Sequence, residues 1–162
     1  MTDKSAALKL LEEEFGNLVQ ATVKLDNAQL DQRWLDGWSV KDIIAHVLGW
    51  EREMIVMLER MGQGEKPLAE GVDYSDSEGW NNRFAIEMRP FNGNTVIAIW
   101  QQTHMNFARA AAALPDDRYG ENDEGKPKTA NRILEGNGYE HYREHAAQIL
   151  EWRQHEGLSE GP

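Results

Sequence analysis

The chain has 162 residues and no cysteine, and its 28 acidic and 17 basic residues give a formal charge of −11. The lack of cysteine excludes disulfides, thiolate metal sites and a cysteine nucleophile. A negative field repels phosphate backbones and anionic lipid, so we expect no nucleic-acid partner and no membrane partner. The chain also shows neither a signal-peptide pattern nor an apolar run near the ~20 residues of a membrane span. We therefore expect a cytoplasmic protein with one domain over residues 1–162.

The first half of the chain predicts two long helices. Residues 5–25 repeat apolar side chains at helical spacing and should form the first helix. The second should cover residues 40–61, because Ser39 and Asp42 have the spacing of a capping box, in which each side chain satisfies a free backbone N–H of the other residue. Residues 26–38, between these helices, should form a polar connection.

The second half predicts two more long helices and a short one. Residues 77–89 should form a short helix that Pro90 ends, and residues 95–113 the third long helix. Residues 115–128 have no periodicity and should form a mobile loop before the fourth helix, residues 129–154. No stretch has the period of a β-strand. We therefore predict an all-α four-helix bundle, with a short extra helix in the long connection between the second and third helices.

The fourth predicted helix carries two histidines on its apolar stripe. His141 and His145 stand four residues apart, which places their Cβ atoms roughly 5–6 Å from each other on one helix face. At this spacing two imidazoles can bind one metal ion. The alternative is a pair of core histidines satisfied by hydrogen bonds, since an unpaired buried polar group costs roughly 1–3 kcal/mol. His155 lies in a polar tail and needs no role.

The second predicted helix supplies a third histidine. His46 lies on the flank of its apolar stripe, where a lone histidine is more often a core residue than a ligand. However, a bundle brings the second and fourth helices together, and three imidazoles leave one coordination position open, as in catalytic metal sites. We therefore predict a divalent metal site at His46, His141 and His145. Imidazole ligands suit zinc, nickel, iron and copper alike.

The same helix places a carboxylate, Glu51, near the centre of its apolar stripe. A buried carboxylate needs a partner, because burial without one raises its pKa or costs several kcal/mol. One predicted partner is an arginine, either Arg83 or Arg132. The other is an N–H of a ligand histidine, whose ring Glu51 would then orient.

Two glycines, Gly136 and Gly138, stand inside the fourth predicted helix, where each costs roughly 1 kcal/mol relative to alanine. Close packing, access to the histidine pair, or a break in the helix would each explain them.

Several aromatic residues are candidates to line a substrate pocket beside the histidines, although aromatic residues at such positions are more often plain core. His104, one turn after a tryptophan on the third helix, should be structural or at most pocket-lining. The candidates are Trp34, Trp38, Trp50, Trp100, His104 and Tyr142.

Two stretches resemble a known superfamily. The run from Gly37 to Glu51, GWSVKDIIAHVLGWE, resembles the second helix of the DinB-like four-helix bundles, and HYREH at 141–145 resembles the fourth. Within that superfamily, Trp50-Glu51, Trp80-Asn81 and the HYREH run are most similar to the ClbS/DfsB group. The resemblance covers roughly residues 5–153.

This resemblance implies a metal site at His46, His141 and His145, which match the superfamily's histidine triad without substitution. Its members include thiol S-transferases that use bacillithiol or mycothiol, an isomerase that uses mycothiol, and proteins for which only metal binding is apparent. The ClbS/DfsB group is associated with self-protection against an electrophilic, DNA-damaging metabolite. DinB-like bundles commonly pair, so a homodimer is expected.

Three functional interpretations remain open at this stage. The first is a metal-dependent enzyme that acts on a small electrophile by thiol transfer or hydrolysis. Since the chain has no cysteine, a thiol would have to come from a low-molecular-weight cosubstrate. The second is a non-catalytic protein that sequesters a toxic small molecule. The third is a helical dimerisation module with vestigial histidines.

Overall fold

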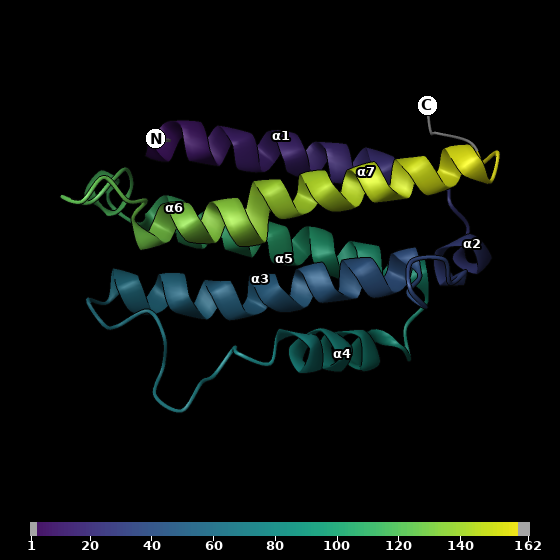
Figure 1. Cartoon of the computed structure of the whole chain (residues 1–162), viewed down its shortest axis with the longest axis horizontal. Helices are drawn as coiled ribbons and strands as arrows, with labels where there is room; N and C mark the ends of the chain where they lie inside the picture. The colour runs from purple at the N-terminus through teal and green to yellow at the C-terminus, as the bar shows by residue number, and fades with distance from the viewer. Residues whose placement is uncertain (1–2, 159–162) are drawn as a thin grey trace.

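Four long helices form the body of the protein, which we describe over residues 3–158 of a computed structural model. The fourth is composite: a short α-helix and a π-helical segment lead into the last α-helix without a loop (Figure 1). The predicted all-α four-helix bundle is therefore confirmed. Its helices are α1 (Lys4–Thr22), α3 (Val40–Gly62), α5 (Gly93–Ala113), and α6 (Thr129–Leu134) with η2 (Glu135–Tyr139) and α7 (Glu140–His155).

Three short helices lie in the connections. The predicted extra helix is α4 (Ser77–Met88), which runs along α3 on the side away from α1 (Figure 1). A turn of 3-10 helix, η1 (Asp116–Arg118), lies in the connection after α5. The connection 26–38 was predicted only as a polar connection, and it contains a short helix that was not predicted, α2 (Asn27–Asp31), whose first turn is closed by a capping box. Five residues are too few to show helical periodicity in the sequence.

The start of α3 fixes the register of the most buried helix in the bundle. Ser39 and Asp42 form the predicted capping box, with the backbone N–H of each donating to the side chain of the other at 3.1 Å. The helix then packs against α5 on one side and α4 on another, so apolar residues cover more of its surface than one stripe. Ile43, Ile44 and Val47 are all 0% exposed. Burial of each such side chain contributes roughly 1.5–3 kcal/mol.

One glycine on α3 sets how closely α4 approaches. A Cβ atom on Gly49 would lie 2.2 Å from the ring of Phe84 in α4, so only glycine permits this contact. Phe84 is buried, and Asn81 lies one helical turn before it on the same face of α4. The close approach therefore brings Asn81 to α3 as well.

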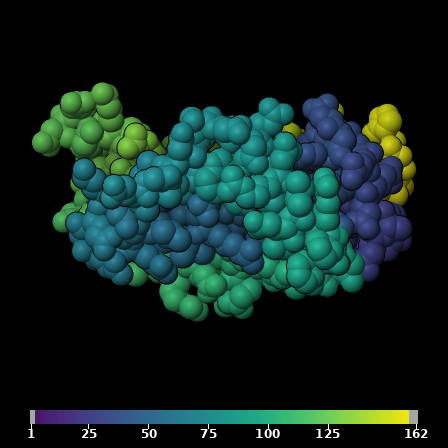
Figure 2. All heavy atoms as spheres, turned by 90° about the horizontal axis from the view of Figure 1, so that it is seen from below, coloured from purple at the N-terminus to yellow at the C-terminus, as the bar shows by residue number. Residues whose placement is uncertain are grey.

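The connection 115–128 projects from one end of the molecule, where it forms a distinct lobe (Figure 2). In the described residues, strand pairing is limited to two isolated bridges, and one of them, Glu121 to Pro127, closes this connection. Within residues 3–158, no helix combines the length and apolar character that a membrane crossing requires.

Candidate metal centre

His46 lies in the first half of α3, on the side that faces α7. Its side chain is buried, with 8% of the residue exposed, and its ring packs edge-to-face against Trp38 at a centroid distance of 5.1 Å. Trp38 is presented by a tight turn in which Asp36 and Gly37 both have positive φ angles, 50° and 86°. The backbone of Leu35 and Trp38 pairs across this turn, which holds Trp38 in place.

His141 and His145 follow the π-helical segment η2. Gly138, within η2, has the non-helical angles φ −122° and ψ −109°, so the break that the sequence left open is present. A Cβ atom on Gly138 would lie 2.5 Å from Leu11 of α1, which explains this glycine by close packing. A Cβ atom on Gly136 would meet no other segment within 4 Å, and nothing in the structure explains this glycine. The π turn and the close contact with α1 fix the direction from which α7 delivers its histidines to α3.

The structure brings the three predicted histidines together at their Nε2 atoms. Nε2 of His46 lies 2.9 Å from Nε2 of His141 and 3.0 Å from Nε2 of His145. One ring nitrogen from each of the three lies within 4.8 Å of the other two. Ligand nitrogens about 2.0–2.1 Å from a tetrahedral zinc ion are about 3.3 Å apart. The two distances from His46 are close to this value, and all three nitrogens lie near enough for one ion to draw them together. We refer to these three residues as the histidine cluster.

The protonation of His46 is fixed by a chain of two hydrogen bonds. The indole N–H of Trp50, which can only donate, donates to Oδ1 of Asn81 at 2.6 Å. The same oxygen lies 3.0 Å from Nδ1 of His46 and can only accept, so Nδ1 must carry the proton. In the neutral ring, Nε2 of His46 is then an unprotonated acceptor that points at His141 and His145. Likewise, Nδ1 of His145 lies 2.8 Å from Oε1 of Gln148.

This arrangement suits a cation better than a hydrogen-bonded core. Nε2 of His46 has one lone pair in the ring plane and two imidazole nitrogens within 3.0 Å, so only one of them can donate to it. Nδ1 of His141 is buried and has no hydrogen-bond partner in the described residues. A divalent ion at the meeting point of the three Nε2 atoms would satisfy all three lone pairs, so the residues present fit a metal ion.

Burial keeps all three imidazoles neutral at physiological pH. It lowers the pKa of His46 to about 4, with a smaller contribution from the nearby His145 and a partial opposing effect of the Asn81 hydrogen bond. Burial also lowers the pKa of His141 well below its usual value, assisted by the other two histidines. The pKa of His145 is lowered by burial and raised slightly by Gln148. Neutral imidazole is the form that binds metal, so protons compete weakly here.

A cavity of about 300 Å³ opens beside the cluster and gives a small molecule access to it. His46 and His145 form part of its wall, so an ion on the cluster would face the cavity through an open coordination position. Of the predicted pocket-lining residues, only Trp38 lines it. The other lining residues are Leu35, Asp36, Glu78, Asn81 and Asn82.

The remaining aromatic candidates have other positions. Trp50 belongs to an aromatic group with Tyr74, Trp80 and Phe84 and braces Asn81. Trp34 stacks on Trp152 at 5.0 Å and lines a separate cavity of about 400 Å³. Trp100, His104 and Tyr142 are buried in the bundle and do not line the cavity beside the histidines.

Glu51 is fully buried, as predicted, but its predicted arginine partners are wrong. Arg83 lies over the ring of Trp80, and Arg132 donates to Thr129. Glu51 instead accepts from the hydroxyl of Tyr142. No hydrogen bond joins Glu51 to the histidine cluster in the described residues. The helical wheel identified the buried carboxylate but gave no information on which helix would face it.

The partners of Glu51 form what we call the core network: Glu51, Tyr142, His104 and Glu12. Nδ1 of His104 lies 2.9 Å from the Tyr142 hydroxyl, and its Nε2 lies 2.9 Å from the carboxylate of Glu12 at the surface. Burial raises the pKa of Glu51, and the neighbouring donors His104, Tyr142 and Trp100 offset this only in part. His104 is therefore structural, as its sequence position suggested.

Sequence reasoning missed the two amides that orient the histidines. Gln148 stands three residues after His145, and this spacing on one helix was an available signal. Asn81 belongs to the Trp80-Asn81 pair that contributes to the family resemblance, but no local pattern connects it to His46, 35 residues earlier in the chain.

Known structures share this fold at low sequence identity. An uncharacterised protein from Escherichia coli UTI89 has a TM-score of 0.83 and 17% identity, with 98% of this chain and 97% of that chain covered. YfiT from Bacillus subtilis, described as a probable metal-dependent hydrolase with a four-helix bundle, has a TM-score of 0.69 and 22% identity, with 96% and 89% covered. A comparison with the sequences of curated proteins finds no significant match.

A third structure corrects the expectation that nucleic acid is excluded as a partner. The colibactin self-resistance protein ClbS, with a TM-score of 0.81, 12% identity and coverage of 95% of this chain and 97% of its own, was solved in complex with double-stranded DNA. The exclusion is therefore wrong for proteins of this fold. It rested on net charge, which sums over the whole surface and does not determine the potential where basic side chains gather.

The family of the chain is shown by its sequence. The model of the mycothiol maleylpyruvate isomerase N-terminal domain matches residues 11–134, about three quarters of the chain, a segment that includes His46 and ends before His141. The assignment of His141 and His145 to one site with His46 therefore depends on the geometry described above. The chain belongs to the mycothiol maleylpyruvate isomerase N-terminal domain family, within the DinB-like superfamily.

Proposed function

We propose that the protein is a metal-dependent enzyme that acts on a small electrophilic molecule, with a divalent ion bound by His46, His141 and His145. The observation that carries this proposal is the convergence of three neutral imidazoles on one point in the wall of a cavity of about 300 Å³. When bound, such an ion acts as a Lewis acid that activates a nucleophile at neutral pH. A cavity at the lower end of the usual range for ligand pockets suits a small substrate.

The surrounding residues have distinct roles in this proposal. Asn81 and Gln148 hold the rings of His46 and His145 in the orientation that directs Nε2 inward. Trp38 supplies an apolar wall against which a substrate can pack. The carboxylates of Asp36 and Glu78 line the same cavity and are exposed, so they can accept a proton from an incoming nucleophile.

The nucleophile is either water or a thiol. With no cysteine in the chain, a thiol must arrive as a low-molecular-weight cosubstrate, and the name of the family refers to mycothiol. Hydrolysis has its own support in the description of YfiT. In both versions the biological role is detoxification or self-protection, the role that the name of ClbS describes for that protein.

The proposal is tested in two steps. Elemental analysis of protein purified without chelators or a histidine tag should find one divalent ion per chain, and none in His145→Ala. His155→Ala, which changes an exposed histidine of the same helix, should retain the ion. Turnover of a model epoxide is then measured with and without a low-molecular-weight thiol.

Each outcome of the assay has one meaning. Turnover that needs the thiol supports transfer, and turnover without it supports hydrolysis. Stoichiometric binding of the epoxide without turnover would replace the enzyme with a sequestering protein. Equal metal content in the wild type and in His145→Ala would reject the site itself.

A further inference from the structure

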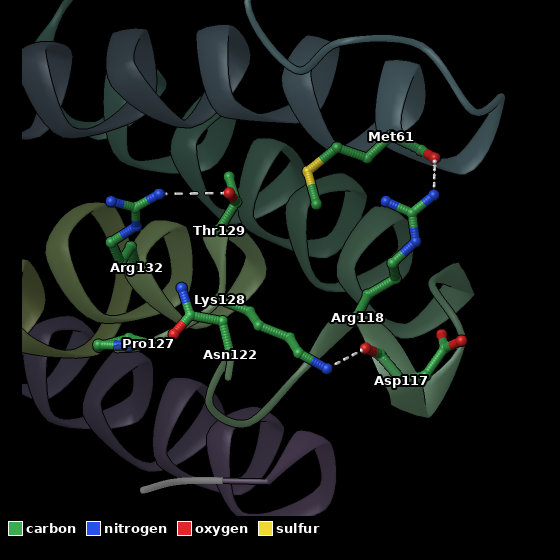
Figure 3. A pocket seen from close by; sticks show the side chains of 8 residues that line it. All are labelled: Met61, Asp117, Arg118, Asn122, Pro127, Lys128, Thr129 and Arg132. Atoms are coloured by element: carbon green, nitrogen blue, oxygen red, sulfur yellow. Dashed lines mark hydrogen bonds between the residues drawn. The ribbon is translucent and has the colours of Figure 1, made fainter. Parts of the chain in front are cut away.

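A further cavity, of about 370 Å³, lies at the end of α3 opposite to the histidine cluster. It is bounded by the last turn of α3, by η1 and the connection after it, and by the start of α6 (Figure 3). At a rise of 1.5 Å per residue, Met61 in its wall is about 22 Å along α3 from His46. The cavity is therefore separate from the histidine cluster, and its volume is within the usual range for ligand pockets, roughly 300–1,000 Å³.

Three cationic side chains line this cavity in a protein with a net charge of −11. Arg118 belongs to η1, whereas Lys128 and Arg132 lie at the start of α6, and Figure 3 shows Arg118 and Arg132 on opposite sides of Thr129. The one carboxylate in the lining is Asp117, so the charged residues of the wall sum to +2. Gathering like charges in this way is unfavourable unless an anion is bound between them.

None of the three cations forms an ion pair within residues 3–158. Arg118 donates to the backbone oxygen of Met61 at 2.9 Å, and Lys128 donates to the backbone oxygen of Asp117 at 2.6 Å. Arg132 donates to Oγ1 of Thr129 at 3.3 Å. These acceptors are neutral, so they position the cationic groups without cancelling their charge.

Another lysine in the same connection, by contrast, does form an ion pair. Lys126, two residues before Lys128, forms an ion pair with Glu124 at 2.8 Å and lies at the surface. Carboxylates are therefore available in this connection, yet they do not pair with the cations that line the cavity. Lys126 also provides a matched control, because its replacement removes the same charge from the same connection.

We infer that this cavity binds a phosphate group. A phosphate monoester carries a charge of about −1.5 to −2 at pH 7 and offers three terminal acceptor oxygens. That charge matches the +2 of the wall, and its acceptor oxygens can receive hydrogen bonds from donors on two segments, η1 and the start of α6. The guanidinium groups of Arg118 and Arg132 have the planar fork geometry that recognises phosphate, and Lys128 adds a point charge. The side chains of Asn122 and Thr129 supply neutral donors to the same ligand.

The phosphate can belong to a small molecule or to the backbone of a nucleic acid, and the experiment separates these sources. Inorganic pyrophosphate and a short DNA duplex are each titrated by calorimetry into the wild type, Lys128→Gln, Arg132→Gln and Lys126→Gln. Loss of one charge-assisted contact should weaken binding by about tenfold or more in the first two variants. Lys126→Gln should bind like the wild type. Circular dichroism melting of each variant shows that it is folded.

The outcomes decide both the site and the source. Pyrophosphate binding with this pattern of variants supports a small phosphate ligand, and duplex binding that pyrophosphate displaces supports a backbone phosphate. The inference is overturned if neither probe binds, if Lys126→Gln and Lys128→Gln have equal effects, or if citrate binds as tightly as pyrophosphate. The same titrations of His145→Ala test whether the histidine cluster takes part in phosphate binding. Loss of binding in that variant would also overturn the inference.

Discussion

The bundle contains two buried polar groups of residues, the histidine cluster and the core network, and they differ in how their polar atoms are satisfied. In the core network, an almost continuous chain of contacts leads from Glu51 through Tyr142 and His104 to a carboxylate at the surface. In the histidine cluster, by contrast, amides orient the rings of His46 and His145 from outside, and the three Nε2 atoms converge although only one neighbour can donate to that of His46.

The two groups differ also in access. Glu51 is 0% exposed and His104 is 1% exposed, and neither borders a cavity beside the histidines, whereas His46 and His145 lie in the wall of one. Both groups place ionisable side chains in an apolar interior, where an unpaired charge is costly. Only in the histidine cluster do neutral ring nitrogens converge so that one bound cation would satisfy their lone pairs. Convergent acceptors beside an open cavity therefore distinguish a candidate site from a buried network that supports the fold.

The largest expected effect is on metal affinity, which should fall much further in His145→Ala than in Tyr142→Phe. His145→Ala removes one of three ligands and should reduce metal affinity by at least about a thousandfold, because metal binding depends on the number of ligands. Tyr142→Phe changes the residue next to His141, another proposed ligand, yet it should leave metal affinity within a few-fold of the wild type. Competition with a chromogenic chelator measures both. Similar losses in the two variants would mean that the two groups of residues are one functional unit.

The next effect concerns the pH dependence of stability in the metal-free protein. The histidines have lowered pKa values in the folded state, so stability is lost as pH falls from about 6.5, where the unfolded chain begins to bind protons. His46 alone, with a pKa of about 4, should contribute a loss of about 3 kcal/mol by pH 4. Glu51, whose pKa is raised, has the opposite sign: stability is lost as pH rises above its unfolded value.

Urea denaturation across this pH range separates the two contributions. In Glu51→Gln the loss of stability at higher pH should disappear, while the loss at acidic pH should remain. Metal binds the neutral imidazoles of the folded state, so it should raise stability at each pH where it stays bound, while the acidic loss, which comes from protonation of the unfolded chain, should remain. An unchanged profile in Glu51→Gln would show that the pKa of Glu51 is the same in the folded and the unfolded chain, against the raised value expected from its burial.

A smaller effect is expected for the hydrogen bonds of the core network. Tyr142→Phe removes the donor to Glu51, one of whose oxygens, Oε2, already has no partner. Leaving the other oxygen unsatisfied should cost about 1–3 kcal/mol of unfolding free energy. Glu51→Gln, which retains the size and most of the hydrogen bonding, should cost less than Glu51→Leu. Equal stability of the three variants and the wild type would mean that the network contributes nothing to the fold.

Periodicity was sufficient to predict the helices and much of the site. The capping box at Ser39 fixed the start of α3, and the i, i+4 spacing of His141 and His145 fixed their common face. Such features are local, so they can be recognised in a single sequence. The short helix α2 was missed because one capped turn has no period. The π turn was left as one of three explanations, because a glycine in a helix signals a defect without specifying its geometry.

Contacts between distant segments could not be predicted in the same way. The partners of Glu51 depend on how α5 and α7 are rotated about their own axes. A helical wheel of α3 alone gives no information on that rotation. Asn81 reaches His46 because Gly49 lets Phe84 approach α3, a dependence that involves two helices and the distance between them. The charge of the whole chain was misleading for a related reason, since it carries no information on local surfaces such as the cavity that Arg118, Lys128 and Arg132 line.

The smallest expected effect tests the link between the cavity and the orientation of His46. Asn81→Leu removes the acceptor that fixes the Nδ1 proton of His46, so the ring can adopt the other tautomer, in which Nε2 is protonated and cannot bind metal. Loss of such an orienting contact typically lowers metal affinity by about 10–100-fold. Asn82→Leu is the matched control, because Asn82 lines the same cavity and makes no hydrogen bond to a histidine within the described residues. Its affinity should equal that of the wild type. If both variants lost affinity equally, the polarity of the cavity rather than the tautomer of His46 would be responsible, and Trp50 and Asn81 would have no positioning role.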